Sequence, residues 1–214
     1  MVSLPRLIFS PKCYILRHVP SLQQSPFARK QNRTGSDTLN KHGISTRKIA
    51  VCGLIAAFYT ALCLATPVLS YGMIQVRVAE ALTLLPVLSP IAIWGVTLGC
   101  AVSNLAGWLS GANPIGYMDV LFGTAATLLA ALISYRLRQV RWFGLPVLSA
   151  LAPVVCNGLI IGAELAILFP IGGGVPSLLV HGFWVAAGEL VACLLLGLPL
   201  VMALERRGIV PDKL

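Results

Sequence analysis

Residues 81–118 read ALTLLPVLSPIAIWGVTLGCAVSNLAGWLSGANPIGYM and contain no charged side chain. About 20 apolar residues are enough for one helix to cross the hydrocarbon core of a bilayer, so this stretch is too long for a single crossing. Ser89-Pro90 divides it, because proline lacks a backbone N–H and disfavours helix at the residue before it. We therefore expect two membrane helices here, at about 78–92 and 93–109.

Similar apolar stretches lie on both sides of this region. Pro67 and Gly72 indicate where the first of them ends, and the turn residues of 170–176 predict a loop before the last. The expected membrane helices are 49–76, 78–92, 93–109, 119–135, 146–169 and 177–204. The sequence therefore predicts an all-α membrane protein with six transmembrane helices.

The overall composition agrees with this class. Hydrophobic residues make up 57% of the 214 residues and charged residues 11%, against roughly 25% charged in soluble domains. The mean hydropathy is +0.85. Such a chain lacks the polar surface that a soluble globular domain needs, which excludes that class.

The net charge of +9 is local. Residues 1–48 hold nine of the sixteen Lys and Arg residues and a single acid, Asp37, whereas the rest of the chain is nearly neutral. The excess of positive charge lies in a basic N-terminal tail, so no nucleic-acid partner is expected. We expect 1–48 to be disordered or to reflect a start placed too early, although its composition resembles a transit peptide. Residues 49–207 form the membrane domain, and 208–214 form a short cytoplasmic tail.

Positive charge also predicts the orientation. With the N-terminus inside, the inner segments carry ten Lys and Arg residues within reach of the membrane, and the outer loops carry one, Arg77. Basic residues are enriched on the cytoplasmic side of membrane proteins. Both termini are therefore expected in the cytoplasm, in a multi-pass protein of the cell membrane.

Polar side chains inside the spans gather toward the outer side. Charged residues within a bilayer cost about 2.5–3.5 kcal/mol each on insertion scales, so each one needs a reason. The candidate substrate-binding residues are Arg77, Glu80, Asn104, Trp108, Asp119, Asn157, Glu164, His181, Trp184 and Glu189. Only Asn157 and Glu189 approach the midplane of the membrane. The sequence thus predicts a polar site in the outer halves of the helices.

Some of these residues have structural alternatives. Arg77 and Glu80 are three residues apart and could form an ion pair that fixes the start of the second helix. Glu164 and Glu189 have no basic residue at similar depth apart from His181, which favours a role in ligand binding or proton handling. His181 and Asn104 could instead simply satisfy other buried polar groups.

A stripe of small side chains marks the first helix. Small residues recur every four positions on one face, at Gly53, Ala57, Ala61 and Ala65. Such a stripe lets a neighbouring helix pack with its backbone close. The neighbour could belong to this chain, but the candidate site involves the other five helices. A partner subunit is therefore the expected user of the stripe.

No motif for a metal or cofactor appears in the sequence. The six cysteines show no CxxC or His-linked spacing, and most of them lie within apolar runs, as small packing residues do. We expect neither a disulfide framework nor a metal or cofactor site.

Several segments together resemble the QueT family of transporters. The most extensive is Gln75-Val-Arg77-Val-Ala-Glu80-Ala-Leu-Thr83-Leu-Leu-Pro86, which is similar to the signature of the family's first two helices. The other segments, in chain order, are Gly99-Cys100, Asn104-Leu105-Ala-Gly107, Asp119-Val-Leu-Phe122-Gly123, Ala126-Thr127-Leu128, Asn157-Gly158, Gly162, Glu164, Gly188-Glu189 and Gly197-Leu198-Pro199-Leu200. The resemblance covers about 47–207, and the basic tail departs from it.

This resemblance implies a function. QueT proteins are the substrate-binding (S) components of energy-coupling factor (ECF) transporters and are assigned to queuosine precursors, which are 7-deazaguanines. An S component binds its substrate from outside and then docks on a transmembrane coupling protein that carries two ATPase subunits. The small-residue stripe matches the docking surface of such proteins. The chain lacks the GxxxxGK[ST] phosphate loop, so ATP hydrolysis would fall to the partners and this chain would not be an enzyme.

The chemistry of a 7-deazaguanine suits the candidate residues. Its guanine edge presents a ring N–H beside an exocyclic amine, and one carboxylate can accept both hydrogen bonds. An aminomethyl arm would add a cation for a second carboxylate, and Trp184 or Trp108 could stack on the rings. The sequence leaves open which carboxylate takes which role.

Three other interpretations remain open. The chain could be an S component for another vitamin or nucleobase, since a fold alone does not determine the function. It could be a proton-coupled secondary transporter, although its six expected helices show no clear inverted repeat. An intramembrane enzyme with a metal at His181 and Asp119 or Glu189 is the third, but no catalytic motif appears.

Overall fold

The computed structural model describes residues 46–72 and 76–208, which belong to one compact helical unit. Its elements are α1 (Thr46–Ala65), α2 (Pro67–Tyr71), the 3-10 helix η1 (Val78–Val87), α3 (Ile91–Leu109), α4 (Tyr117–Leu137), α5 (Val147–Leu168), α6 (Gly174–Leu190), the π-helical segment η2 (Val191–Gly197) and α7 (Leu198–Arg206). Most of the predicted basic tail, at 1–45, lies outside the described residues, as do 209–214. The described part of the chain contains no strand beyond one isolated bridge, which confirms the all-α class there.

Five helices within the described residues are long and apolar enough to cross a membrane. They are Thr46–Ala65, Ile91–Leu109, Tyr117–Leu137, Val147–Leu168 and the continuous helix Gly174–Arg206, which comprises α6, η2 and α7. Three of these, Ile91–Leu109, Tyr117–Leu137 and Val147–Leu168, agree with the predicted spans to within a few residues. The fifth starts inside the predicted loop at 170–176. These helices make the protein multi-pass.

The first two predicted spans differ from the structure. The span expected at 49–76 is divided, because α1 ends at Ala65 and Pro67 begins the short α2. Residues 73–75 of that expected span lie outside the described residues. The span expected at 78–92 is the 3-10 helix η1, which ends at Val87. At a rise of about 2.0 Å per residue, a helix of this length covers about 20 Å, less than the hydrocarbon thickness.

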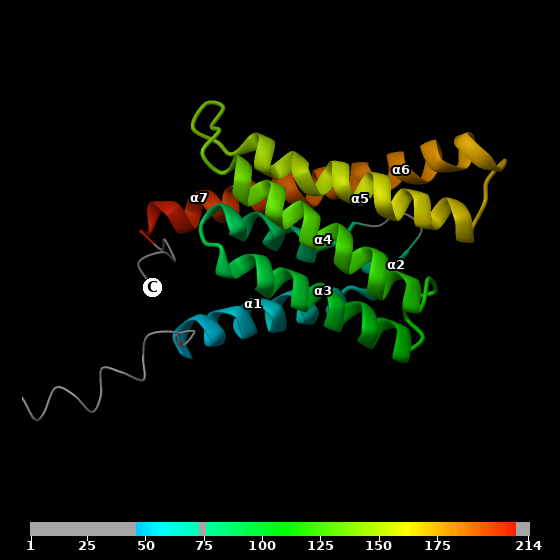
Figure 1. Ribbon diagram of the computed structural model, residues 1–214, viewed down its shortest axis with the longest axis horizontal. Helices are drawn as coiled ribbons and strands as arrows, with labels where there is room; N and C mark the ends of the chain where they lie inside the picture. Colours follow the sequence, from blue (N-terminus) through cyan, green and yellow to red (C-terminus); the bar gives the residue numbers. More distant parts are fainter. Residues whose placement is uncertain (1–45, 73–75, 209–214) are drawn as a thin grey trace, which may run out of the picture. The chain divides into compact units, whose positions relative to one another are not determined.

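Helix η1 lies at the centre of the bundle. Almost all of its residues are buried, and it contacts α1, α3, α4, α5, η2 and α7. Pro86 inside it removes a backbone donor that a regular α-helix would use. The long helices surround it in chain order, α1 beside α3, α3 beside α4, α4 beside α5 and α5 beside α6 (Figure 1).

Glycines allow the closest helix contacts. A Cβ atom at Gly99 of α3 would lie 2.6 Å from the Cβ of Tyr59 on α1. A Cβ atom at Gly162 of α5 would lie 2.6 Å from the Cα of Gly182 on α6. These separations are too short for non-bonded carbon atoms, so the backbones could not approach this far with larger residues.

The two ends of the bundle differ in charge. The start of α1, the connection between α4 and α5 and the end of α7 lie together at one end (Figure 1). We call this the basic end, because it carries all but one of the described Lys and Arg residues: Arg47, Lys48, Arg136, Arg138, Arg141, Arg206 and Arg207. The exception, Arg77, precedes η1 near the opposite end.

Candidate functional site

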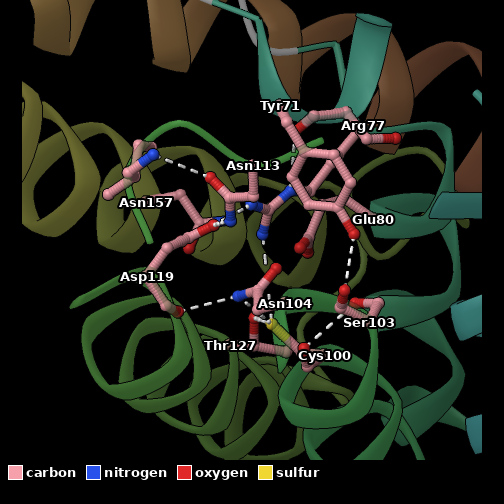
Figure 2. Close-up of polar contacts among 12 residues, drawn as sticks. Tyr71, Arg77, Glu80, Cys100, Ser103, Asn104, Asn113, Asp119, Thr127 and Asn157 are labelled. Atoms are coloured by element: carbon pink, nitrogen blue, oxygen red, sulfur yellow. Dashed lines mark hydrogen bonds and ion pairs between the residues drawn. The ribbon is translucent and has the colours of Figure 1, made fainter. Parts of the chain in front are cut away.

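A buried ion pair anchors the polar residues at the end opposite the basic end. Arg77 is buried just before η1, and its Nη2 donates to Oδ2 of Asp119 on α4 at 2.8 Å. Its Nε donates to the Ser70 carbonyl at 3.1 Å, and its guanidinium lies 5.7 Å from the centre of the Tyr71 ring. Asn113 Nδ2 donates to the same Asp119 oxygen at 2.7 Å (Figure 2). The Arg77 guanidinium and the Asp119 carboxylate therefore each form more than one hydrogen bond.

This arrangement corrects one prediction. The ion pair proposed between Arg77 and Glu80 is wrong, because Arg77 pairs with Asp119, 42 residues further along the chain. Glu80 is completely buried in the first turn of η1 and accepts a hydrogen bond from the Tyr59 hydroxyl of α1. The sequence did not predict a contribution of α1 to the polar site, but the Tyr59 hydroxyl of α1 donates a hydrogen bond to Glu80.

Asn104 of α3 fixes the start of α4. Its Nδ2 donates to the Asp119 carbonyl at 2.7 Å and lies 3.5 Å from Cys100 Sγ, which also receives the Thr127 hydroxyl at 3.2 Å. A Cβ atom at Gly123 would collide with the Asp119 carboxylate and would lie 2.7 Å from Asn104 Nδ2. Glycine at this position therefore leaves room for the amide and the carboxylate. Figure 2 shows the Asn104 amide directed at the Asp119 carbonyl.

A second polar group lies deeper in the bundle. Asn157 of α5 donates through Nδ2 to Oε1 of Glu189 on α6 at 2.8 Å. The Cys193 thiol lies 3.8 Å from Glu189 Oε2 and 3.6 Å from the Glu80 carbonyl oxygen. The Thr83 hydroxyl donates to that carbonyl at 2.5 Å. Glu80 and Glu189, predicted on separate helices, are thus brought to either side of one cysteine.

Glu164 differs from the other carboxylates. It is 5% exposed, near the end of α5, and neither of its oxygens has a hydrogen-bond partner among the described residues. The other buried side-chain atoms without a partner in this part of the chain are Glu80 Oε2, Asn104 Oδ1, Asp119 Oδ1, Thr124 Oγ1 and Asn157 Oδ1. Every one is an oxygen, and all except the Thr124 hydroxyl, which can also donate, belong to carboxylates or amides. The region therefore has a surplus of hydrogen-bond acceptors.

The remaining predicted residues lie outside this hydrogen-bonded group. His181 is buried on α6, and its Nε2 lies 2.8 Å from the Phe169 carbonyl, a structural partner at the start of the α5–α6 connection. Trp108 and Trp184 are exposed on the bundle surface, at 43% and 44%. The buried aromatic rings next to the carboxylates belong to Tyr59 and Tyr71 instead.

Sequence reasoning missed several contributing residues. Tyr59, Tyr71 and Asn113 contact candidate residues directly, and Thr127 is linked to Asn104 through Cys100. None of the four carries a charge that would mark it within an apolar stretch. Tyr59 had one indication: with Ala56 and Cys63 it forms the buried face of α1. Cys100 was interpreted as a packing residue, and it is buried, but its sulfur also accepts hydrogen bonds.

The described residues contain no group of three His, Cys, Asp or Glu side chains arranged to hold a metal ion. His181, Asp119 and Glu189, considered above for such a site, each have other partners.

The small-residue stripe on α1 faces away from the bundle. Gly53, Ala57, Ala61 and Ala65 are all exposed, and a Cβ atom at Gly53 would meet nothing within 4 Å among the described residues. The large neighbours Leu54 and Phe58 are more than 60% exposed as well. No described helix of this chain covers the stripe.

Comparison with known proteins identifies the family. The model of the QueT transporter family matches residues 49–206, well over half of the chain. No match was found among the curated proteins or the solved structures with which the chain was compared. The family has a transport role rather than a catalytic one, which implies a small-molecule substrate and a membrane location. With its buried polar residues inside a bundle of membrane-spanning helices, the chain belongs to the QueT transporter family.

Proposed function

We propose that the chain is the S component of an ECF importer and that it captures a 7-deazaguanine precursor of queuosine from outside the cell. Family membership supports a transporter with a small-molecule substrate. The residues proposed to bind this substrate are Arg77, Glu80, Asn104, Asp119, Asn157, Glu164 and Glu189, with His181, Trp108 and Trp184 at the margin.

The proposed topology has six crossings with both termini in the cytoplasm. Helix η1 serves as the second crossing, shortened and buried among the other helices. The start of α1 and the end of α7 lie at the same end in Figure 1, as an even number of crossings requires. Basic residues favour the cytoplasmic side, so the basic end is inside and Arg77, Asp119 and Glu164 lie toward the outside.

The observation that supports the substrate assignment is the surplus of buried acceptors without partners, to which Glu164 contributes two oxygens. A buried acceptor without a partner costs about 1–3 kcal/mol, and more when it is charged. The nearby amide nitrogens of Asn104, Asn113 and Asn157 already donate to other groups. A ligand that suits this region must therefore supply hydrogen-bond donors.

A 7-deazaguanine with an aminomethyl arm is rich in donors. Its ring N–H and exocyclic amine can donate side by side to one carboxylate, and its ammonium can pair with a second. Glu164, with both oxygens unpartnered, is our assignment for the guanine edge. The formal charge agrees, since the residues that the structure describes include four buried carboxylates, Glu80, Asp119, Glu164 and Glu189, and one buried arginine, Arg77.

The exposed stripe on α1 supports the coupling step. In this proposal the transmembrane coupling protein packs against Gly53, Ala57, Ala61 and Ala65, and the two ATPase subunits drive release inside. Small residues allow the backbones to approach closely. Tyr59 lies on the opposite face of α1 and donates a hydrogen bond to Glu80. In this proposal one face of α1 therefore binds the coupling protein and the other contributes to the substrate site.

Binding and uptake test the proposal separately. Calorimetry on the purified chain should detect the aminomethyl compound with higher affinity than the matched nitrile, which replaces the ammonium with an acceptor. Tight binding of an unrelated vitamin, without binding of either deazaguanine, would overturn the substrate assignment.

Uptake into cells should require the coupling protein and its ATPases and should survive collapse of the proton gradient while ATP is maintained. Uptake that persists without the ATPases and stops when the proton gradient collapses would instead identify a proton-coupled secondary transporter.

A further inference from the structure

The connection between α4 and α5 ends in a tight turn with an unusual conformation. The backbone N–H groups of Trp142 and Leu145 donate to each other's carbonyls at 2.9 and 3.0 Å. Phe143 and Gly144, between them, have φ angles of +51° and +80°. Phe143 is the only residue other than glycine with a positive φ among the described residues. A bulky side chain rarely adopts this conformation, so the turn holds Phe143 against its local preference.

This turn exposes two aromatic rings. Trp142 is 65% exposed and Phe143 is 92% exposed, and their rings stack with centres 6.1 Å apart. The adjacent Arg141 donates to both carboxylate oxygens of Glu205 on α7, at 2.6 and 3.2 Å. This ion pair connects the turn to the end of α7. The turn projects beyond the ends of α4 and α5 (Figure 1).

Positive charge without an acidic partner in the described chain lies at the same end of the bundle as the rings. Glu205 is the only described acid at the basic end, and its partner is Arg141. Arg138 lies with its guanidinium 3.9 Å from the centre of the Tyr135 ring. Arg206 and Arg207 are exposed at the end of α7 and form no ion pair within the described chain. Arg136 is exposed in the last turn of α4. We call these residues of the basic end the basic aromatic surface: Arg136, Arg138, Trp142, Phe143, Arg206 and Arg207.

We propose that the basic aromatic surface binds the headgroups of anionic phospholipids. Trp and Tyr side chains favour the interface between hydrocarbon and water, and Phe143 supplies further apolar area. Arginine forms strong, directed hydrogen bonds to phosphate oxygens. The charge of the surface selects anionic over zwitterionic lipid, because each basic residue near an anionic membrane contributes attraction that a neutral one does not provide. This assignment is independent of the transported substrate.

Quenching of tryptophan fluorescence by brominated lipid tests the site. Trp94, Trp108 and Trp184 are replaced by Phe, so that Trp142 is the sole tryptophan in a chain reconstituted into nanodiscs. Two lipid mixtures contain the same amounts of phosphatidylglycerol, phosphatidylcholine and bromine, and differ only in which lipid is brominated. Trp142 should be quenched about twofold or more strongly when the phosphatidylglycerol carries the bromine, because bound anionic lipid is enriched beside it.

Two comparisons make the result decisive. A chain with Trp108 as its sole tryptophan reports from the opposite end and should show no preference between the mixtures. Arg206→Gln with Arg207→Gln, two exposed residues, should abolish most of the preference at Trp142, since each arginine contributes on the order of fivefold in lipid affinity. Equal quenching of Trp142 by both mixtures would overturn the proposal. So would an equal preference at Trp108, or a preference at Trp142 that survives the double substitution.

Discussion

The two carboxylate oxygens of Asp119 have different surroundings. Its Oδ2 receives hydrogen bonds from Arg77 and Asn113, at 2.8 and 2.7 Å, while its Oδ1 is buried without a partner in the described chain. A buried carboxylate persists only when other groups compensate for its lost hydration. We infer that Arg77 and Asn113 hold this carboxylate in place with one oxygen left for a ligand.

Removal of one partner from this pair should be costly. Arg77→Met leaves the Asp119 carboxylate buried with Asn113 alone, and breaking a buried ion pair typically costs about 3–5 kcal/mol. Arg141→Met removes an arginine from the partly exposed pair with Glu205 and should cost less than about 1 kcal/mol. Unfolding of the two variants in detergent compares these losses. Equal destabilisation would show that the buried pair contributes no more than the exposed one.

The sequence identified the charged residues of the site but not their pairing. Glu80, Asp119, Glu164 and Glu189 stand out because charge is rare within apolar stretches. The possible pairing of Arg77 with Glu80, one of two alternatives from the sequence, assumed that neighbours in sequence would meet. Arg77 instead lies before η1, where it reaches a helix 42 residues away, and this depends on how the helices pack. Local spacing contains no such information.

Among the helices, the long ones were predicted from the long uncharged stretches of the sequence. The predicted spans 93–109, 119–135 and 146–169 match α3, α4 and α5 closely. The 3-10 form of η1 could not be predicted, since its residues are as apolar as those of a membrane helix. Its tight form reflects burial on all sides, together with Pro86 inside it. The exposure of the α1 stripe also required the structure, because the sequence allowed an internal partner as well.

Enlarging the stripe should separate binding from transport. Ala57→Leu or Ala61→Trp adds bulk on the exposed face of α1, where close approach of a partner needs small side chains. Substrate affinity of the isolated chain should remain unchanged, and uptake in the assembled transporter should be abolished.

Ala125→Leu provides the matched control for the stripe, since Ala125 is exposed on α4 and should tolerate the same change in both assays. Loss of substrate binding in the stripe variants would mean that this face of α1 supports the site and not a partner. Uptake at the control level would rule out docking there.

Across the whole molecule, the two ends of the bundle carry different kinds of residue. Arginines and two exposed rings concentrate at the basic end, whereas the buried carboxylates lie toward the other end or at mid-depth. In the proposed orientation the first set contacts the cytoplasmic leaflet and the second is reached from outside. Charge patterning in the sequence predicted this division before any helix contact was known.

Labelling of single cysteines tests the orientation. In a background without native cysteines, Ala112→Cys and Val175→Cys lie in or near the two connections at the proposed outer end, and Gln139→Cys lies at the basic end. A membrane-impermeant thiol reagent added to whole cells should label the first two and spare the third. The reverse pattern would place the basic end outside and make the carboxylates accessible from the cytoplasm instead.

Calorimetry of Glu164→Gln with the aminomethyl 7-deazaguanine tests whether buried carboxylate oxygens recognise a ligand rich in hydrogen-bond donors. The substitution replaces one acceptor oxygen with a donor, and a charge-assisted bond of this kind contributes about 1.5–3 kcal/mol. At about 1.4 kcal/mol per factor of ten, affinity should fall by one to two orders of magnitude. Glu205→Gln, the same change at the basic end, should leave affinity unchanged. Wild-type affinity in Glu164→Gln would contradict the account.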